Sequence, residues 1–317
     1  MNILVTGGAG YVGSVTIPEL VNSGHNVKCL DRFFFGIDYL SQKQFENKVE
    51  LIKDDIRWFD PKILDEVDVV IDLAALSNDP VGDLDPAKTY EINHLGRARV
   101  SKLSKERGVS RYILASSASI YGQQEEVVDE NAAIKPLTAY SKANRKAEES
   151  ALPLNDDSFT VTALRFSSVY GISPRMRFDT AVNVMVLDLF NKGKITVRGQ
   201  GNKRPFVHIL DVARAYEVVI NASKEKIGGQ IFNVGSDEQN YEMGQLAKEI
   251  TDGVGEECQL ELEDSPDHRS YTASFSKIRE TLNFVPNYTV KQGAKEIYEA
   301  LKSGALKETK KTKTVEW

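Results

Sequence analysis

Residues 2–13 read NILVTGGAGYVG, and this stretch decides the expected fold. Its first five residues are mostly apolar or β-branched, as in a buried strand, and an amphipathic segment at Tyr11 to Ser23 follows. Between them lie Gly7, Gly10 and Gly13, spaced G-x-x-G-x-x-G. Glycine permits a tight turn and lets backbone N–H groups approach a pyrophosphate at the positive end of a helix. The stretch therefore predicts a strand, a nucleotide-binding turn and a helix.

An acidic residue closes the next predicted strand, Asn26 to Asp31. At that position a carboxylate can bind both hydroxyls of an adenosine ribose, and it repels the 2′-phosphate that distinguishes NADP from NAD. Arg32 could pair with such a phosphate, although an arginine here more ordinarily lies on the surface near the adenine. The sequence thus favours NAD as the cofactor.

Short apolar runs alternate with longer amphipathic stretches through the first half of the chain, a pattern typical of parallel strands joined by crossover helices. Further strands are predicted at Val49 to Lys53, Val67 to Leu73, Arg111 to Ser116, Thr160 to Arg165 and Gln230 to Val234, and helices at Pro86 to Arg107, Tyr140 to Leu154 and Leu210 to Ser223. The expected fold class is α/β, a Rossmann-type doubly wound parallel sheet with a smaller C-terminal α/β substrate-binding domain. We expect the NAD-binding domain at residues 1–170, with 206–235 returning to it, and the second domain at 171–317, with a disordered tail from about 303.

Composition excludes several classes of protein. The 317 residues include 40 Lys or Arg and 46 Asp or Glu, a formal net charge of −6, so no basic field draws the chain onto nucleic acid. The only cysteines are Cys29 and Cys258, which exclude a structural zinc site and favour a reducing compartment; no metal is expected. With neither a secretory signal nor an apolar run of about 18 residues, we expect a cytoplasmic protein without membrane contact.

Two further stretches carry a family resemblance: SSASIYG at residues 116–122, after a strand, and PLTAY at residues 136–140, opening a helix. With the glycine turn they resemble the extended short-chain dehydrogenase/reductases, and among these the NAD-dependent epimerase/dehydratase family acting on nucleotide sugars, which includes the UDP-glucose 4-epimerases. The resemblance covers nearly the whole chain. It implies that Tyr140 takes a proton from a sugar hydroxyl, that Ser117 shares the hydrogen bond, and that hydride passes to the nicotinamide of NAD.

The resemblance also implies binding residues, position by position. For the cofactor these are Gly7, Gly10, Tyr11, Val12, Gly13, Asp31, Arg32, Asp55, Ile56, Leu73, Ala74, Ala75, Asn93, Ser116 and Tyr140. For a nucleotide-diphosphate sugar they are Ser117, Ser168, Arg175, Arg177, Asn183, Arg204 and Arg269, several being arginines whose planar fork suits phosphate oxygens. Asn93 is implied to prop the active-site strand from its helix. The arginines at 175 and 177 could instead form an ordinary solvent-facing loop pair.

One position departs from the family, which has Lys four residues after the tyrosine where this chain has Asn144. The family lysine binds the nicotinamide ribose and lowers the pKa of the tyrosine. At about 3.6 residues per turn, Lys142 and Lys146 point away from the Tyr140 side, and Glu148 matches a family Glu, so the register is intact. Asn144, counted here as catalytic, can hydrogen-bond a ribose but carries no charge. Three interpretations stay open: a substitution made to trap a complex, a natural variant using the cofactor's own positive charge, and an enzyme with weakened redox chemistry.

The residues after Ser117 narrow the reaction. Family dehydratases have Asp and Glu there as acid and base, whereas this chain has Ala118 and Ser119. Because the chain lacks this proton donor, 4,6-dehydration and decarboxylation are disfavoured. Reductive 3,5-epimerisation is also disfavoured, because it needs a Cys near the Ser. The sequence favours a 4-epimerase acting by transient C4 oxidation of an NDP-hexose. Residues 171–179 resemble GDP-heptose 4-oxidising enzymes of surface-polysaccharide pathways, so a 4-dehydrogenase or 4-reductase remains an alternative, as does an impaired NAD-binding sensor or scaffold.

A homodimer is also implied by the resemblance. Relatives often dimerise by packing two helices of each chain into a four-helix bundle. The predicted helices Pro86 to Arg107 and Tyr140 to Leu154 are their counterparts here.

Overall fold

The computed structural model describes residues 1–77, 79–264 and 269–314. The chain folds into two compact units, each assembled from several sequence segments. The first unit comprises Met1–Ile120, Pro136–Arg165 and Ala213–Phe232, and the second comprises Tyr121–Lys135, Phe166–Val212 and Asn233–Trp317. Among the described residues, no helix is both long and apolar enough to cross a membrane.

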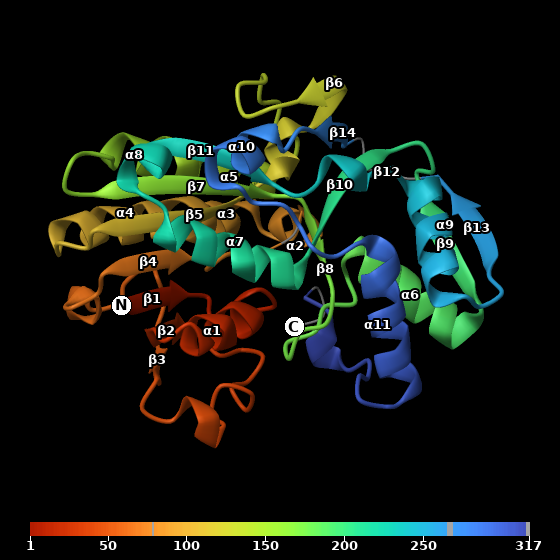
Figure 1. Cartoon of the computed structure of the whole chain (residues 1–317), viewed down its shortest axis with the longest axis horizontal. Coiled ribbons are helices and arrows are strands. Elements are labelled where there is room, and N and C mark those ends of the chain that lie inside the picture. Colours follow the sequence, from red (N-terminus) through yellow and green to blue (C-terminus); the bar gives the residue numbers. More distant parts are fainter. Residues whose placement is uncertain (78, 265–268, 315–317) are drawn as a thin grey trace. The chain divides into compact units, whose positions relative to one another are not determined.

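A seven-stranded sheet frames the first unit (Figure 1). Its strands are β1 (Asn2–Thr6), β2 (Asn26–Asp31), β3 (Val49–Lys53), β4 (Val69–Asp72), β5 (Arg111–Ser117), β7 (Thr160–Phe166) and β11 (Gln230–Val234). They lie in the order β11-β7-β5-β4-β1-β2-β3, and the pairs from β3 to β5 are parallel. The strand order reverses between β1 and β4, and in doubly wound folds ligands bind at such a point, beyond the carboxyl ends of the strands. The predicted α/β class is confirmed, with β4 shorter than expected.

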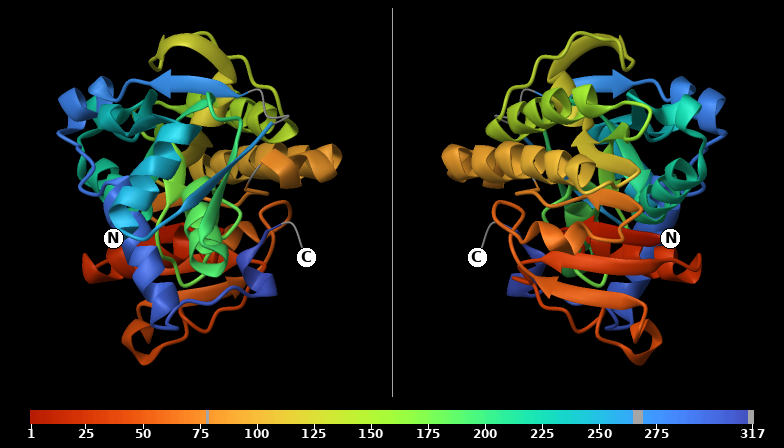
Figure 2. Two further views of the ribbon diagram at one scale, coloured as in Figure 1. Left: turned by 90° about the vertical axis from the view of Figure 1, so that its right-hand side faces the viewer. Right: turned by 90° about the vertical axis from the view of Figure 1, so that its left-hand side faces the viewer.

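Helices cover both faces of this sheet. They are α1 (Gly13–Asn22), α2 (Asp79–Leu84), α3 (Pro86–Tyr90), α4 (Arg97–Glu106), α5 (Ala139–Ala151), α7 (Ile209–Asn221) and α8 (Lys224–Ile227). α4 and α5 pack together on one face, and α1 lies on the other (Figure 2). The predicted helix at 86–107 is interrupted by a π-helical turn, Glu91–Gly96, which the sequence did not indicate. Short 3₁₀ turns lie at Lys43–Phe45, Pro61–Leu64, Ala118–Tyr121 and Leu152–Leu154.

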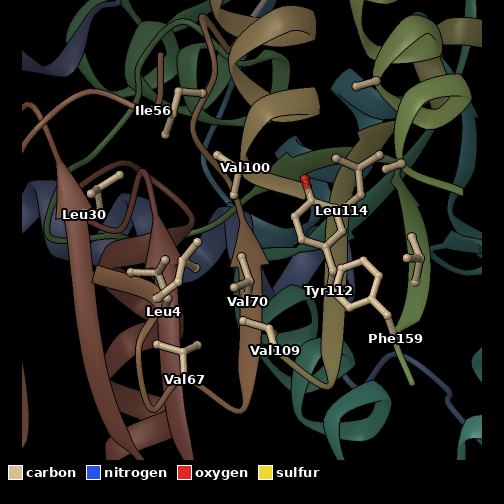
Figure 3. Close-up of a cluster of buried hydrophobic side chains, with 14 of the residues drawn as sticks. Leu4, Leu30, Ile56, Val67, Val70, Val100, Val109, Tyr112, Leu114 and Phe159 are labelled. Atoms are coloured by element: carbon tan, nitrogen blue, oxygen red, sulfur yellow. The ribbon is translucent and has the colours of Figure 1, made fainter. Parts of the chain in front are cut away.

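The alternation of side chains along the strands builds a core beneath α4 and α5. Leu4 of β1 lies opposite Val70 of β4, Val70 lies opposite Tyr112 of β5, and all three side chains are fully buried (Figure 3). Tyr112 and Phe159 extend the cluster toward β7, with their ring centroids 6.3 Å apart. Each large apolar side chain buried in this way contributes about 1.5–3 kcal/mol. By the same alternation, the side chains of Thr6, Asp72 and Ser116 point toward α4 and α5. This face of the sheet is therefore apolar along most of its strands and polar at their carboxyl ends.

The second unit holds smaller sheets and a group of helices. Its strands are β6 (Gln123–Val128), β8 (Ser168–Tyr170), β9 (Lys194–Arg198), β10 (Lys203–His208), β12 (Asn240–Glu242), β13 (Gln259–Glu263) and β14 (Ser270–Ala273), and its helices are α6 (Ala181–Lys192), α9 (Met243–Val254), α10 (Ser276–Leu282) and α11 (Val290–Lys302). The sheets are β12-β10-β8, β13-β9 and β14-β6. Because β6 pairs with β14, residues 121–135 belong to this unit, whereas the sequence placed them in the first domain.

Residues 303–314, the described part of the predicted tail, depart from the expected disorder. A 3₁₀ turn forms at Lys310–Thr312, and Thr312 and Thr314 are buried. The carbonyl oxygen of Thr312 accepts a hydrogen bond from the N–H of Phe178 at 2.8 Å, and the N–H of Thr314 donates to Asp179 Oδ2 at 2.9 Å. Order here comes from backbone hydrogen bonds to a distant loop, which leave no periodic apolar signal in the sequence.

Candidate cofactor and catalytic site

The glycine turn between β1 and α1 is shaped by close backbone contacts. A Cβ at Gly13 would lie 2.5 Å from the Cα of Gly8, and one at Gly7 would lie 2.7 Å from the Cα of Ala74. Gly7 also has a φ of +67°, a conformation that favours glycine. The N–H of Gly10 donates to the carbonyl oxygen of Gly7 at 3.0 Å and closes the turn. A side chain at Gly7 or Gly13 would thus collide with backbone, and the tight turn leads directly into the N-terminus of α1, an arrangement suited to a pyrophosphate.

Asp31, at the carboxyl end of β2, lies beside this turn. Its Oδ2 accepts a hydrogen bond from the N–H of Ala9 at 3.0 Å, and its Oδ1 accepts one from the N–H of Phe33 at 2.7 Å. These backbone donors fix the orientation of the carboxylate. A carboxylate at the carboxyl end of the second strand is the group that binds the hydroxyls of an adenosine ribose in dinucleotide-binding folds.

Asp55 gathers two arginines after β3. Arg57 donates to it through Nε at 3.0 Å and through a terminal nitrogen at 2.9 Å, and Arg32 donates at 3.0 Å. Burial opposes ionisation of Asp55, yet the hydrogen bonds and charge of Arg57, with Arg32, hold its pKa below the usual value. Arg32 is therefore engaged with a carboxylate, which leaves it less suited to a 2′-phosphate. Ile56 differs from the implied role, because its side chain is buried in the core and packs near Gly96.

The segment after β4 is held in place from two sides. The N–H of Leu73 donates to the carbonyl oxygen of Thr6 at 3.1 Å, and that of Ala74 donates to the Thr6 hydroxyl at 3.2 Å. Asn93 is fully buried and holds Leu76 through both amide atoms, at 2.8 and 2.9 Å. Leu73, Ala74 and Ala75 remain half-buried. Asn93 thus acts on the backbone of the strand end, and its side chain is not presented to a ligand.

Tyr140 stands at the start of α5, which is fixed by several caps. The Thr138 hydroxyl accepts a hydrogen bond from the N–H of Ser141 at 3.1 Å, completing a capping box. Asp83 of α2 accepts one from the N–H of Ala139 at 2.9 Å. Gly82 packs so closely against the helix that a Cβ added to it would lie 3.0 Å from the Cβ of Tyr140. The half-buried tyrosine is thus carried by a rigid helix terminus.

Ser117 ends β5 and is half-buried. Its Oγ donates to Ser119 Oγ at 2.9 Å and accepts a hydrogen bond from the N–H of Ser119 at 3.1 Å. β5 packs against α5, the helix that carries Tyr140. Ser116, implied as a cofactor contact, is buried, and its hydroxyl donates to Glu148 at 2.6 Å, so it supports α5 from beneath.

The predicted register of α5 is confirmed, since Asn144 is buried while Lys142 and Lys146 are exposed. The Asn144 Nδ2 donates to the carbonyl oxygen of Tyr140 at 3.0 Å, and its Oδ1 accepts a hydrogen bond from Arg97 at 2.9 Å. An uncharged amide therefore occupies the position where the resemblance implies lysine.

Comparison with known proteins decides what this arrangement is. Residues 3–235 match the model of the NAD dependent epimerase/dehydratase family. The chain belongs to that family. A Methanocaldococcus jannaschii protein named "Putative UDP-glucose 4-epimerase" is 29% identical over 312 residues, covering 95% of this chain and 98% of that protein. The UDP-glucose 4-epimerase of Lactobacillus helveticus is 27% identical, covering 91% and 93%.

Solved structures of similar proteins agree with the fold. MoeE5, in complex with UDP-glucuronic acid and NAD, is 25% identical with a TM-score of 0.85, over 96% of this chain and all of that one. The UDP-glucuronic acid 4-epimerase of Bacillus cereus, with UDP-glucuronic acid and NAD, is 24% identical with a TM-score of 0.86, over 96% and 99%.

NAD is the cofactor of the epimerase/dehydratase family, and the first unit of this member fits it. The glycine turn accepts no side chain at Gly7 or Gly13, and the carboxylate of Asp31 lies beside it, held by the N–H of Ala9. Tyr11 is buried in that turn, and Val12 precedes the first residue of α1. The residues that would hold NAD are thus the glycine turn, Asp31 and the strand-end segment from Leu73 to Ala75.

The residues implied for the substrate, apart from Ser117, lie in the second unit, and two of them are unlike a solvent-facing loop. Arg175 and Arg177 are both buried, so that alternative is wrong. Arg177 Nε donates to Asp179 at 2.7 Å, and a terminal nitrogen of Arg175 donates to the Thr314 hydroxyl at 3.0 Å. Burial raises the pKa of Asp179, but the charge and hydrogen bond of Arg177 outweigh it and hold the pKa below its usual value.

The other implied substrate residues are placed as follows. Asn183 of α6 is fully buried; its Oδ1 accepts a hydrogen bond from the N–H of Gly171 at 3.1 Å, so it shapes the loop that contains the arginines. Arg204 of β10 donates to the carbonyl oxygen of Arg269 and lies over the ring of Tyr271, 5.8 Å from its centroid. Ser168 is half-buried on β8. The side chain of Arg204 thus lies against the backbone of Arg269.

Residues that the sequence analysis missed also bear on the site. Asp83 caps the helix of Tyr140, Arg57 orders Asp55, and the ion pair of Asp72 with Arg97 lies beneath Asn144. Asp72 had a visible signal, because it interrupts the apolar strand VVID, where an acidic side chain demands a buried partner. No local pattern identified the partner.

Proposed function

We propose that this protein is an NAD-dependent nucleotide-sugar 4-epimerase that acts on an NDP-hexose by transient oxidation at C4. One observation carries the choice among family reactions. Ala118 and Ser119, which follow Ser117, are buried at the start of a 3₁₀ turn, and neither carries a carboxyl group. Elimination of water or loss of carbon dioxide needs a second acid or base near the proton-transfer tyrosine. Epimerisation needs only one group that removes a proton and returns it.

The chain's own residues take the following parts. Tyr140 removes the proton of the sugar 4-hydroxyl and returns it, and Ser117 shares the hydrogen bond and orders that hydroxyl. The glycine turn and Asp31 position the dinucleotide, and Arg204 with Arg269 neutralises the substrate diphosphate. When bound, NAD supplies a hydride acceptor that can give the hydride back. Return to the opposite face of the keto sugar inverts C4, so no net redox change is required.

The relatives support this assignment by their names. The Lactobacillus helveticus relative is named UDP-glucose 4-epimerase, the Methanocaldococcus jannaschii relative is named "Putative UDP-glucose 4-epimerase", and the Bacillus cereus structure is a UDP-glucuronic acid 4-epimerase. Another relative is the UDP-glucuronic acid decarboxylase 1 of Arabidopsis thaliana, 29% identical over 92% of this chain and 68% of that protein. The missing carboxyl group after Ser117 weighs against that reaction here.

The test incubates the purified protein with UDP- and GDP-hexoses and GDP-heptose, following reduced-nicotinamide absorbance and resolving products by NMR. A C4 epimer formed without net NADH accumulation supports the proposal. A keto sugar with accumulating NADH would identify a 4-dehydrogenase instead, and cofactor binding without turnover would identify a sensor or scaffold. The variant Tyr140→Phe is the control, because it should bind NAD normally and lose turnover.

A further inference from the structure

Arg97, the first residue of α4, is a buried cation beneath the proposed catalytic helix. Its side chain is 1% exposed. One terminal nitrogen donates to Asn144 Oδ1 at 2.9 Å, and the other donates to the carbonyl oxygens of Asp72, at 3.0 Å, and of Ala115. A guanidinium stays charged in proteins and is costly to bury unless its charge is balanced. Its place at the centre of the unit therefore calls for an explanation.

The balancing charge comes from the sheet. Asp72 is fully buried, and its Oδ2 lies 3.5 Å from Arg97 Nε. The Thr6 hydroxyl donates to Asp72 Oδ1 at 2.5 Å, and the Tyr112 hydroxyl donates to Oδ2. Asp72 is thus satisfied from the sheet side, and Arg97 lies between it and Asn144. The pair presents its positive end to α5.

Arg97 also determines which way the Asn144 amide points. A guanidinium only donates hydrogen bonds, so the atom of Asn144 that faces it must be the carbonyl oxygen. The NH₂ group then faces the other way, where it donates to the carbonyl oxygen of Tyr140 at 3.0 Å. An amide NH₂ has two hydrogens, and this bond uses one of them.

Other titratable groups surround this arrangement. Asp79 and Asp83 of α2 lie at the N-terminus of α5, where Asp79 Oδ1 accepts from the Thr138 hydroxyl. Burial raises the pKa values of Tyr112 and Tyr216 well above normal, so both stay neutral. The charges of Arg97 and Asp72 and the side chain of Tyr140 all act on Tyr216. These groups therefore lie within electrostatic reach of one another.

We propose that Arg97 is a positioning residue for the proposed reaction, acting through Asn144. It places against Asn144, four residues after Tyr140, the positive charge that an ammonium at position 144 would otherwise carry, and it holds the Asn144 NH₂ toward the Tyr140 end of α5. Position 144 and position 97 then share one function. This inference rests on the proposed function for the role of Tyr140, but the coupling of the two positions is independent of turnover.

The first test is a charge-swap cycle of N144K, R97M and N144K/R97M, measured as melting temperature and as NAD affinity by calorimetry. N144K alone brings a second cation against Arg97, so it should melt lower and bind NAD at least about tenfold more weakly. Adding R97M should recover both quantities. N144K as stable and as tight as the parent, or a double variant no better than N144K, overturns the proposal.

The second test addresses the charge itself, by pH profiles of sugar turnover. D72N/R97M removes the whole ion pair and avoids leaving Asp72 buried alone. The acid-side limb should move up by about 1 pH unit, because the tyrosine phenolate loses its cation. R97K, which keeps the charge, should lie near the parent. An unmoved limb in folded D72N/R97M overturns the electrostatic role.

A matched control separates this effect from loss of buried charge in general. Glu148 and Arg165 form an equally buried pair one turn further along α5, at 2.8 Å. E148Q/R165M should lower the melting temperature and leave the limb in place; an equal shift would overturn the proposal. If the parent binds NAD but turns over no sugar, the proposed function fails, and the swap cycle still decides the coupling of Arg97 with Asn144.

Discussion

Gly13→Ala is the sharpest perturbation of the cofactor-binding turn. The added Cβ would lie 2.5 Å from both the Cα and the carbonyl oxygen of Gly8. Ordinary contacts begin near about 3.4 Å, so the start of α1 must move by roughly 1 Å, because the atoms on both sides are backbone. Overpacking of this kind costs about 1–3 kcal/mol of folding free energy. The same displacement misaligns the N–H groups at the start of α1.

The expected loss of NAD affinity can be estimated from the hydrogen bonds that those N–H groups would make. A hydrogen bond to a charged group contributes about 1.5–3 kcal/mol, and about 1.4 kcal/mol changes an affinity tenfold. Loss of one such bond to the pyrophosphate should weaken NAD binding by roughly ten- to a hundredfold. Calorimetric titration with NAD gives the affinity, and urea unfolding gives the stability.

Gly24→Ala is the matched control just beyond the other end of α1. No atom lies within 4 Å of its added Cβ, but its φ of +88° makes alanine strained, by about 1–2 kcal/mol. It should therefore lose comparable stability and keep its NAD affinity. The reasoning fails if Gly13→Ala binds NAD like the parent, or if Gly24→Ala weakens binding as much.

Further predictions concern stability and assembly. Asp179→Asn should lower the free energy of unfolding by about 1–2 kcal/mol at neutral pH. Because the pKa of Asp179 is lowered in the folded state, this deficit should vanish as pH falls through that pKa. Urea unfolding at several pH values measures it, and a deficit that is unchanged in acid contradicts the prediction. Phe159→Ala, 1% exposed in the core, should cost about 3–5 kcal/mol by the same assay, and a loss below about 1 kcal/mol contradicts the packing. Leu95 is 58% exposed, and in the proposed homodimer it would be covered, so Leu95→Glu should elute as a monomer beside a dimeric parent; two identical elution profiles argue against this interface.

The sheet of the first unit could be predicted because its signals are local. Apolar runs bounded by turn residues located the strands, and the glycine spacing located the nucleotide-binding turn. The register of α5 followed from helical periodicity together with the match of Glu148 to a family glutamate, and the buried Asn144 confirms it. The π-helical turn at Glu91–Gly96 could not be predicted, because it accompanies tertiary bonds between Asn93 and Leu76.

The interactions that were missed join residues far apart in the sequence. Because β6 pairs with β14, residues 121–135 belong to the second unit, and the sequence of neither strand indicates which strand it pairs with. Asp72 was visibly out of place in an apolar strand, but the choice of Arg97 depends on how α4 packs on β4. Burial of Arg175 likewise depends on Thr314, which composition alone assigned to a solvated tail.

The hydrogen bond between Asp179 and Thr314 spans 135 residues. A chain emerging from the ribosome therefore acquires every strand of the seven-stranded sheet before Thr314 has been made. The loop that contains Arg175 and Arg177 must wait for that segment to arrive. Synthesis thus imposes an order of assembly in which the nucleotide-binding framework is complete while the proposed sugar-binding loop still lacks its last attachment.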